Sequence, residues 1–201
     1  MAKRTAKSGK KSRSGRLRIV AGIWRSRLLQ IADVPGLRPT SERIRETLFN
    51  WLAPRISGAR CLDLFAGSGA LGLEALSRGA AEAVFVEKSA VAASVLQSNI
   101  ELLGDAAATV CHADAFDFLH SEAARGFDIV FLDPPFAADM LDNLCRLLDE
   151  VPVFADGALV YLEEDRASPE LQLPEGWRVM KSKTAGNVRY SLVTPDDKDQ
   201  R

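Results

Sequence analysis

The sequence predicts an α/β protein whose core is a mostly parallel sheet covered by helices on both faces. From about Arg60 onward, short apolar runs typical of buried strands alternate with helical patterns. A glycine-rich segment joins the first of these strands to the first helix. Near the C-terminus, two β-rich runs meet at Ala185-Gly186-Asn187, which predicts an antiparallel hairpin. Together these features indicate a Rossmann-like sheet of seven strands with a reversed edge.

The individual elements follow from the same patterns. Strands are expected at residues 61–65, 83–86, 108–111, 127–132 and 158–162, and the terminal hairpin pairs residues 177–183 with 188–193. Helices are expected at residues 71–78, 91–103, 116–119 and 140–148, with Gly79 and Gly104 ending the first two. Sheets of this kind bind ligands at the carboxyl ends of their strands, so the polar residues that follow the strands are the candidate site.

The N-terminal part of the chain differs from the rest in composition and in its pattern of apolar residues. Residues 1–15 are mostly Lys, Arg, Ser and Gly, so we expect a disordered basic tail. Residues 17–24 and 27–30 predict a small hairpin outside the main fold, and Thr40 or Ser41 then caps a helix. The expected divisions are a tail at 1–15, a hairpin-and-helix extension at 16–52, the main domain at 53–195 and a C-terminal tail at 196–201.

Composition narrows the class of protein. The chain has 201 residues, of which 47% are hydrophobic and 26% charged, and this excludes wholesale disorder and a disulfide-rich miniprotein. No apolar run approaches the ~20 residues of a membrane span, and no signal peptide follows the basic start, so we expect a cytoplasmic protein. With three cysteines far apart and two histidines, we expect neither a disulfide framework nor a metal site.

Charge is distributed unevenly along the chain. Residues 1–45 hold 13 basic and 2 acidic residues, a net charge of +11, whereas the remainder carries −12. A basic arm on an acidic body indicates a polyanionic partner, and nucleic acid is the interpretation that we favour. A solvated tail that only aids solubility is the alternative.

The glycine-rich segment leaves the first strand and opens a helix. Gly67, Gly69 and Gly72 match the G-x-G-x-x-G pattern, in which backbone N–H groups approach a ligand closely. Asp63 ends the strand, where it would face the ligand; it would repel a pyrophosphate and attract an ammonium or sulfonium group. Glu87 ends the second strand, where it can accept both hydroxyls of a ribose, a need shared by NAD and S-adenosylmethionine.

Asp114 follows the third strand and has two interpretations. Its carboxylate can accept a hydrogen bond from the exocyclic amine of an adenine, or it can cap the next helix. One residue can do both, and the sequence leaves the two interpretations open.

The tetrapeptide Asp133-Pro134-Pro135-Phe136 follows the fourth strand. Two prolines stiffen the loop and remove two N–H donors, which leaves carbonyl acceptors beside the Asp133 carboxylate. An exocyclic base amine can donate one hydrogen to Asp133 and another to the Pro134 carbonyl, while Phe136 stacks on the ring. Two fixed acceptors aim the nitrogen lone pair at an electrophilic methyl group, and Asp133 can then take the released proton.

These motifs together resemble class I S-adenosylmethionine-dependent methyltransferases, and more closely the RsmD-type family of 16S rRNA guanine-N2 methyltransferases. The resemblance extends from Leu17 onward and is carried by residues 38–52, 63–80 and 133–136. Residues 38–52 (RPTSERIRETLFNWL) are the discriminating stretch, since many methyltransferases share the other two. The basic extension before Leu17 departs from the family pattern, so the resemblance says least about the role of this segment.

The resemblance implies a site for S-adenosylmethionine and a pocket for a flipped guanine. It assigns the methionine end of the cofactor to Asp63, Phe65, Ala66, Gly67, Ser68 and Gly69, with Thr40 at the cofactor mouth. It assigns the ribose to Glu87 and Lys88, the adenine to Asp114 and Ala115, and the guanine to Asp133, Pro134, Pro135 and Phe136. The implied partner is 16S rRNA in the small ribosomal subunit or its assembly intermediate, met by a monomer that needs no metal.

Arginines of the N-terminal extension are candidates for RNA contact. Because the segment from Arg38 to Leu52 would close over the cofactor mouth, we expect its arginines to bind phosphates. The alternative is a capping segment with solvated arginines. The expected RNA-binding residues are Arg16, Arg18, Arg25, Arg38, Arg43 and Arg45.

Three other functions are compatible with parts of the sequence. An adenine-N6 methyltransferase acting on DNA or RNA would use the same Asp133 cluster, which does not distinguish the two amines. A dinucleotide-dependent oxidoreductase explains the glycine loop but leaves Asp63 and the two prolines unexplained. A ribosome-assembly factor with a degenerate methyltransferase fold is the least favoured, because every expected site residue is present.

Overall fold

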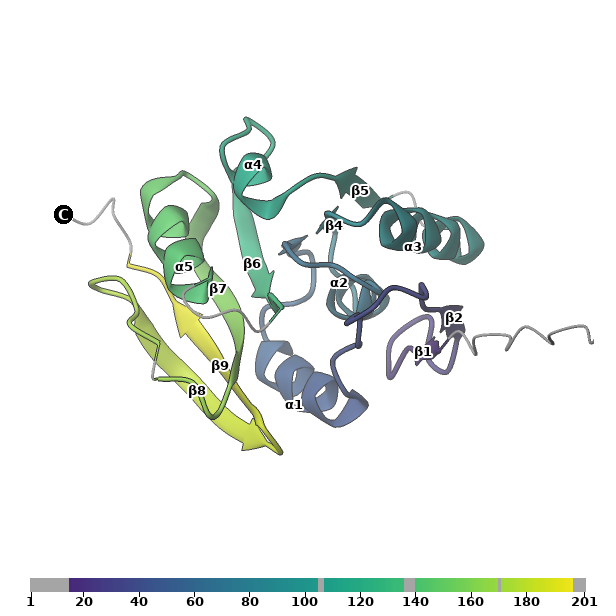
Figure 1. Ribbon diagram of the computed structural model, residues 1–201, viewed down its shortest axis with the longest axis horizontal. Helices are drawn as coiled ribbons and strands as arrows, with labels where there is room; N and C mark the ends of the chain where they lie inside the picture. Colours follow the sequence, from purple (N-terminus) through teal and green to yellow (C-terminus); the bar gives the residue numbers. More distant parts are fainter. Residues whose placement is uncertain (1–14, 105–106, 136–139, 170, 197–201) are drawn as a thin grey trace, which may run out of the picture.

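The central sheet has seven strands, arranged in the order β5-β4-β3-β6-β7-β9-β8 (Figure 1). The computed structural model describes residues 15–104, 107–135, 140–169 and 171–196. The strands are β3 (Arg60–Asp63), β4 (Glu82–Glu87), β5 (Ala108–His112), β6 (Phe127–Leu132), β7 (Phe154–Asp165), β8 (Arg178–Ala185) and β9 (Val188–Thr194). Each apolar run that predicts a strand forms one.

Strand directions match the expected fold. The first five strands of the sheet, β3 to β7, are parallel to their neighbours, and β9 lies antiparallel between β7 and β8. The predicted mostly parallel sheet with an antiparallel C-terminal hairpin is therefore confirmed. β7 extends beyond its apolar run because β9 pairs with its polar end, where Asp165 lies opposite Val188.

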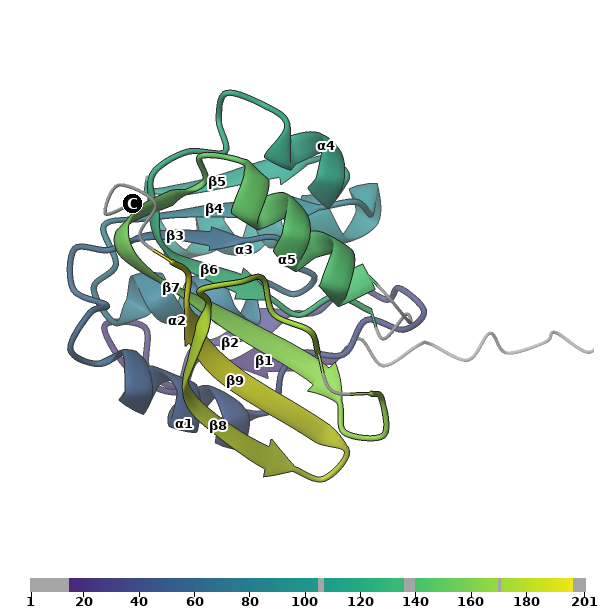
Figure 2. The same cartoon turned by 90° about the vertical axis from the view of Figure 1, so that its left-hand side faces the viewer.

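Helices cover both faces of the sheet (Figure 2). One hydrophobic cluster packs α1 (Glu42–Leu52), α2 (Ala70–Ser77) and α3 (Ala90–Leu103) on the first face. A second cluster packs α4 (Ala115–Leu119) and α5 (Met140–Glu150) on the opposite face. Ser41 caps α1, with its hydroxyl accepting the N–H of Ile44, and Gly104 ends α3 in the left-handed region as predicted. No helix in the described parts of the chain is long and apolar enough to cross a membrane.

The predicted N-terminal hairpin forms between β1 (Arg16–Arg18) and β2 (Leu28–Gln30). It docks on the helices of the first face. The Ser77 carbonyl, at the end of α2, accepts the Ile23 N–H at 2.8 Å, and Asn99 of α3 exchanges two hydrogen bonds with the backbone of Gln30. Buried apolar side chains of the hairpin belong to the same core as α1 to α3. The prediction that the hairpin lies outside the main fold is therefore wrong.

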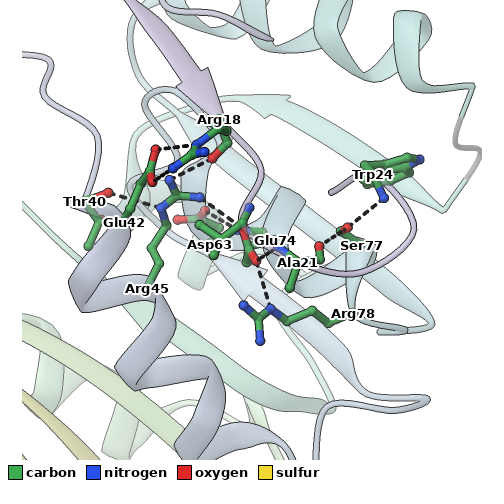
Figure 3. Close-up of polar contacts among 12 residues, drawn as sticks. Arg18, Ala21, Trp24, Thr40, Glu42, Arg45, Asp63, Glu74, Ser77 and Arg78 are labelled. Carbon is green, nitrogen blue, oxygen red and sulfur yellow. Dashed lines mark hydrogen bonds and ion pairs between the residues drawn. The ribbon is translucent and has the colours of Figure 1, made fainter. Parts of the chain in front are cut away.

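Glu74 lies in the middle of α2 and is fully buried. Its carboxylate accepts the N–H groups of Val20 and Ala21 at 2.9 Å each, Nε of Arg78 at 2.8 Å and Nη1 of Arg45 at 3.0 Å (Figure 3). Each oxygen thus receives one backbone donor and one guanidinium donor. A buried carboxylate is stable only when its charge is paired and its lone pairs are bonded, and here both conditions hold.

Arg45, on the inner side of α1, is the second centre of this network. Only 1% of its surface is exposed. Besides Glu74, its guanidinium donates to the carbonyls of Arg18 at 2.9 Å and Thr40 at 3.2 Å (Figure 3). Arg45 therefore ties β1, the start of α1 and α2 together. The prediction that Arg45 binds RNA phosphates is wrong, because its guanidinium is buried and its donors are used inside the protein.

We expect Arg45→Met to destabilise the fold. The substitution keeps most of the side-chain volume but removes a cation from beside the buried Glu74 carboxylate. The free energy of unfolding should fall by about 3 kcal/mol, the scale of a broken buried ion pair. Arg43→Met, on the exposed side of the same helix, is the matched control and should change it by less than about 0.5 kcal/mol. Urea unfolding followed by circular dichroism measures both, and equal losses would contradict the assignment.

Candidate active site

The glycine loop between β3 and α2 has the backbone that its pattern predicts. Gly67 and Gly69 have φ values of +52° and +75°, in the left-handed region that favours glycine. Gly69 is the N-cap of α2, and its N–H donates to the Ala66 carbonyl at 2.6 Å. Gly72 has a different role, since a Cβ there would lie 2.2 Å from the Phe85 ring. Two glycines therefore shape the turn and the third allows α2 to pack on β4.

Asp63 ends β3 and lies beneath this loop. Only 2% of its surface is exposed, and its Oδ2 accepts the Gly72 N–H at 3.1 Å. Burial raises the pKa of Asp63 to about 7. The hydrogen bond from Gly72 holds the start of α2 in place. The contact of Asp63 with the cofactor stays a prediction.

Glu87, at the end of β4, is half-buried against the same loop. Its Oε2 accepts the Gly67 N–H at 2.8 Å and its Oε1 accepts the Ser89 N–H at 2.6 Å. These bonds fix the carboxylate at the carboxyl edge of the sheet, beside the glycine turn. Its contact with a ribose stays a prediction.

Asp114 follows β5 and is the N-cap of α4, which is one of the two roles that the sequence predicts for it. Its Oδ1 accepts the Phe116 N–H at 2.9 Å, and its Oδ2 lies 3.0 Å from Nζ of Lys88. The hydrogen bond from Lys88 holds the pKa of Asp114 below its usual value. Capping is confirmed, and the contact with an adenine stays a prediction.

Four more residues assigned to the cofactor lie close to Asp63 and Asp114 in the sequence. Phe65 is half-buried, whereas Ala66, Ser68 and Ala115 are buried. All four belong to the segments that follow β3 and β5, so the structure places them at the same edge of the sheet.

Asp133, Pro134 and Pro135 leave the end of β6, next to β3 in the sheet. The three residues are half-buried, buried and exposed, in that order. Thr40, which precedes the cap of α1, donates its hydroxyl to Oδ2 of Asp133 at 3.1 Å. Burial raises the pKa of Asp133 to about 6, although the bond from Thr40 opposes the rise. Phe136, predicted to stack on the base, lies outside the described residues.

Glu163, near the end of β7, is a site residue that the sequence reasoning missed. It is 4% exposed, and the Tyr161 hydroxyl donates to its Oε1 at 2.6 Å. The same rule that finds Asp133 could have found it, because a carboxylate directly follows the apolar run at residues 158–162.

Four of these carboxylates lie together at one edge of the sheet: Asp63, Glu87, Asp133 and Glu163. The charges of Asp133 and Glu87 raise the pKa of Asp63, and the charge of Asp133 raises that of Glu163, so the four groups are close enough to interact. Such an edge attracts a cation and repels a pyrophosphate. In the described parts of the chain, no group of three or more His, Cys, Asp or Glu side chains is arranged to hold a metal ion.

Comparison with known proteins identifies the family. The family described as Conserved hypothetical protein 95 matches residues 17–194. "Ribosomal RNA small subunit methyltransferase D" of Escherichia coli K12 is 46% identical over 181 residues, which cover 90% of this chain and 91% of that protein. The chain belongs to the RsmD-type methyltransferase family.

Solved structures agree with this RsmD-type assignment. The structure of yhhF from Escherichia coli superposes with a TM-score of 0.85 at 42% identity, covering 90% of this chain and 99% of that one. A more distant methyltransferase, solved as a complex with SAH, has a TM-score of 0.62 at 15% identity and covers 79% of this chain and 50% of that one. The fold is therefore that of class I methyltransferases.

The arginines of the RsmD-type extension are exposed, apart from Arg45. Arg18 forms an ion pair with Glu42 at the start of α1, so part of its charge is neutralised locally. RNA contact stays a prediction for this group, which consists of Arg16, Arg18, Arg25, Arg38 and Arg43.

Two alanine substitutions separate the packing role of Gly72 from the turn role of Gly67. We expect Gly72→Ala to lower the free energy of unfolding by about 1–3 kcal/mol, because its Cβ would overlap the Phe85 ring. At Gly67 the nearest side-chain atom would lie 3.7 Å away, in Leu37, so Gly67→Ala carries only the left-handed backbone cost of about 1 kcal/mol. Urea unfolding compares the two, and a larger loss for Gly67→Ala would refute this division of roles.

Proposed function

We propose that this chain transfers a methyl group from S-adenosylmethionine to the exocyclic N2 amine of a guanine in 16S rRNA, within the small subunit or its assembly intermediate. The proposal depends mainly on the position of the Asp133 carboxylate at the end of β6. The Thr40 hydroxyl donates a hydrogen bond to its Oδ2 at 3.1 Å and so fixes its orientation. β3 and β6 are neighbours in register, with Asp63 opposite Phe131, so the glycine loop and Asp133 open at the same edge. A cofactor and an amine bound there would meet.

The residues at this edge fit the proposed cofactor. S-adenosylmethionine carries a positive sulfonium and an ammonium group, and the four carboxylates supply a negative surface. We assign the methionine end to the loop at residues 65–69 above Asp63, the ribose to Glu87 and Lys88, and the adenine to Asp114 and Ala115. When bound, the cofactor supplies an electrophilic methyl group. A more distant structure that shares the fold was solved as a complex with SAH, which supports a cofactor of this class.

The protein's own contribution to the reaction is to hold the amine. The Asp133 carboxylate and the Pro134 carbonyl accept its two hydrogens, and the rigid Pro134-Pro135 pair keeps the acceptors in place. The nitrogen lone pair then points away from both acceptors and toward the cofactor. As the nitrogen gains a fourth bond its proton becomes acidic, and Asp133 is placed to take it. Phe136 completes the pocket in this proposal as a stacking surface for the base.

Isotope transfer tests the proposal directly. Purified small subunits and their assembly intermediates are incubated with the protein and methyl-labelled S-adenosylmethionine, and the rRNA nucleosides are analysed by mass spectrometry. N2-methylguanosine is the expected product. N6-methyladenosine would instead support the adenine alternative, since Asp133 and Pro134 accept either amine. A protein that binds the cofactor yet methylates no particle would refute both.

Asp133→Ala should abolish turnover without abolishing cofactor binding. Loss of an acceptor that orients the amine and takes its proton should lower kcat by about a hundredfold or more. The affinity for S-adenosylmethionine, measured by calorimetry, should stay within a few fold because the glycine loop is untouched. Asp117→Ala, an exposed carboxylate on α4, is the matched control and should keep full activity. Full turnover by the Asp133 variant would remove this residue from the mechanism.

The rate should rise with pH through about 6, because only ionised Asp133 accepts the hydrogens of the amine. The Thr40 hydroxyl stabilises the ionised form, so Thr40→Val should move this acid limb to higher pH. Profiles of kcat/KM between pH 5 and 9 measure the shift. An acid limb at the same pH in both proteins would show that Thr40 does not set the ionisation of Asp133.

A further inference from the structure

β8 is the outer strand of the sheet, and its side chains are exposed on both faces. Residues 178–184 are all exposed, whereas residues 190–193 of the neighbouring β9 are all buried. β8 carries three basic residues, Arg178, Lys181 and Lys183, and no acidic residue. The part of the chain that follows the N-terminal extension is acidic overall. A basic strand on an acidic domain indicates a local contact with a polyanion.

Lys181 and Lys183 lie on the face of the sheet that α1 covers. Their cross-strand partners on β9 are Leu192 and Tyr190, and both belong to the hydrophobic core of that face. Cross-strand partners point to the same side of a sheet, so the lysines point that way too. Trp51 of α1 stacks on Tyr190 with 5.5 Å between the ring centroids, so α1 lies against β9, one strand in from the lysines (Figure 1).

The charges of these two lysines are not neutralised inside the protein. Among the residues that the structure describes, no acidic side chain forms an ion pair with Lys181 or Lys183. Arg189, on the opposite face of the same hairpin, is instead paired with Glu164. The two lysines are two residues apart on one face, so their like charges repel each other, and a bound phosphate would offset this repulsion.

The strand register places Lys183 level with the candidate catalytic carboxylate. Lys183 pairs with Tyr190, and Tyr190 pairs with Glu163 of β7. β7 and β6 pair at the residues immediately before Glu163 and Asp133, so these two carboxylates are also level. Three interstrand spacings, about 14 Å, therefore separate Lys183 from Asp133 across the sheet. An RNA backbone that runs from a base held at Asp133 toward β8 would cross the lysines.

The lysines and the arginines of the N-terminal hairpin lie on opposite sides of Asp133. The hairpin docks on α3 through Asn99 and Gln30, and α3 packs on β4 and β5. β8 is at the other end of the sheet, and β6 lies between the two (Figure 1). The edge that carries Asp133 is therefore flanked by a basic surface on each side.

We propose that Lys181 and Lys183 form a docking surface for the phosphate backbone of the substrate RNA. Together with the arginines of the N-terminal hairpin, this surface holds the backbone on both sides of the target base. Contacts with phosphates carry no base specificity, but they fix the position of the RNA on the protein. The role rests on the proposed methylation of rRNA and adds a second contact region to it.

Lysines on an outer strand can have a different role, which is to prevent the strand from pairing with another chain. In that case neutral side chains at Lys181 and Lys183 would allow a second copy of the protein to pair with β8. RNA affinity would then stay unchanged. The two roles therefore predict different results for the same substitutions.

The double variant Lys181→Gln/Lys183→Gln tests the docking surface. It removes two charges and keeps exposed polar side chains. Its Kd for purified small subunits, measured by filter binding, should rise about tenfold at physiological salt. The slope of log Kd against log salt concentration should fall by about 1.5, because each lost phosphate contact removes slightly less than one. The KM for subunits should rise likewise, whereas kcat and the affinity for S-adenosylmethionine should be little changed.

Two controls separate this local effect from net charge. Lys181→Arg/Lys183→Arg keeps both charges and should keep the wild-type Kd and salt slope. Arg146→Gln removes an exposed cation from α5, on the opposite face of the sheet, and is the matched control for Lys183→Gln. Its Kd should stay within about twofold of wild type, since it lies far from the proposed path of the backbone.

Equal Kd and salt slope in wild type and the double glutamine variant would overturn the proposal. Equal losses in Arg146→Gln and Lys183→Gln would do the same, because the response would then be to net charge alone. A dimer of the double variant in size-exclusion chromatography, with RNA affinity unchanged, would assign the lysines to protection of the strand edge and would also overturn it.

Binding and methylation distinguish failure of this inference from failure of the proposed function. A wild-type protein that binds the subunits without methylating them refutes the function, and the comparison of Kd values still decides the docking surface. A wild-type protein that methylates the subunits, with no difference in Kd from the double variant, overturns the docking surface alone. A wild-type protein that binds no particle refutes both.

Discussion

The buried carboxylate of Glu74 is the interaction on which the other parts of the structure depend. Its four donors come from the N-terminal extension, from α1 and from the C-cap of α2, so one charge fixes three segments. Arg45 extends this control because it also binds the Thr40 carbonyl, and the Thr40 hydroxyl binds Asp133. The candidate catalytic carboxylate is thereby connected to the buried Arg45–Glu74 ion pair through one residue, Thr40.

The candidate site brings several carboxyl groups close together, and in the free protein no bound cation offsets their mutual repulsion. Burial raises the pKa values of Asp63, Asp133 and Glu163, which means that their ionised forms are unfavourable where they stand. A bound cation would reverse this effect, because it stabilises each neighbouring carboxylate in its charged form. Cofactor binding and ionisation of the site are therefore coupled: a sulfonium donor would help to create the ionised acceptor that the amine requires.

Local patterns predicted the sheet and the edge at which most candidate site residues lie, and tertiary contacts explain what they missed. Strands, glycine turns and the Asp133 loop depend on neighbours in sequence, which spacing reveals. Arg45 lies four residues before the buried Phe49, so its place on the inner side of α1 was visible in the helical pattern. Its partner Glu74 is 29 residues away, however, and no local pattern shows that a charge is neutralised across such a distance. The burial of Glu163 was hidden for the same reason, since its cross-strand neighbour Tyr190 lies on β9, a distant part of the sequence.

The N-terminal extension holds the candidate RNA-binding arginines in a fixed position relative to the candidate catalytic residue Asp133. Its hairpin and α1 share a core with α2 and α3, so the exposed Arg18 and Arg43 stand on rigid elements rather than on a separate module. α1 also begins beside Thr40, which holds Asp133. A guanine held at Asp133 would belong to an RNA whose backbone meets these same elements. Because a displacement of about 1 Å can cost a hundredfold in rate, a platform that shares its core with the catalytic edge is a physical requirement of oriented transfer.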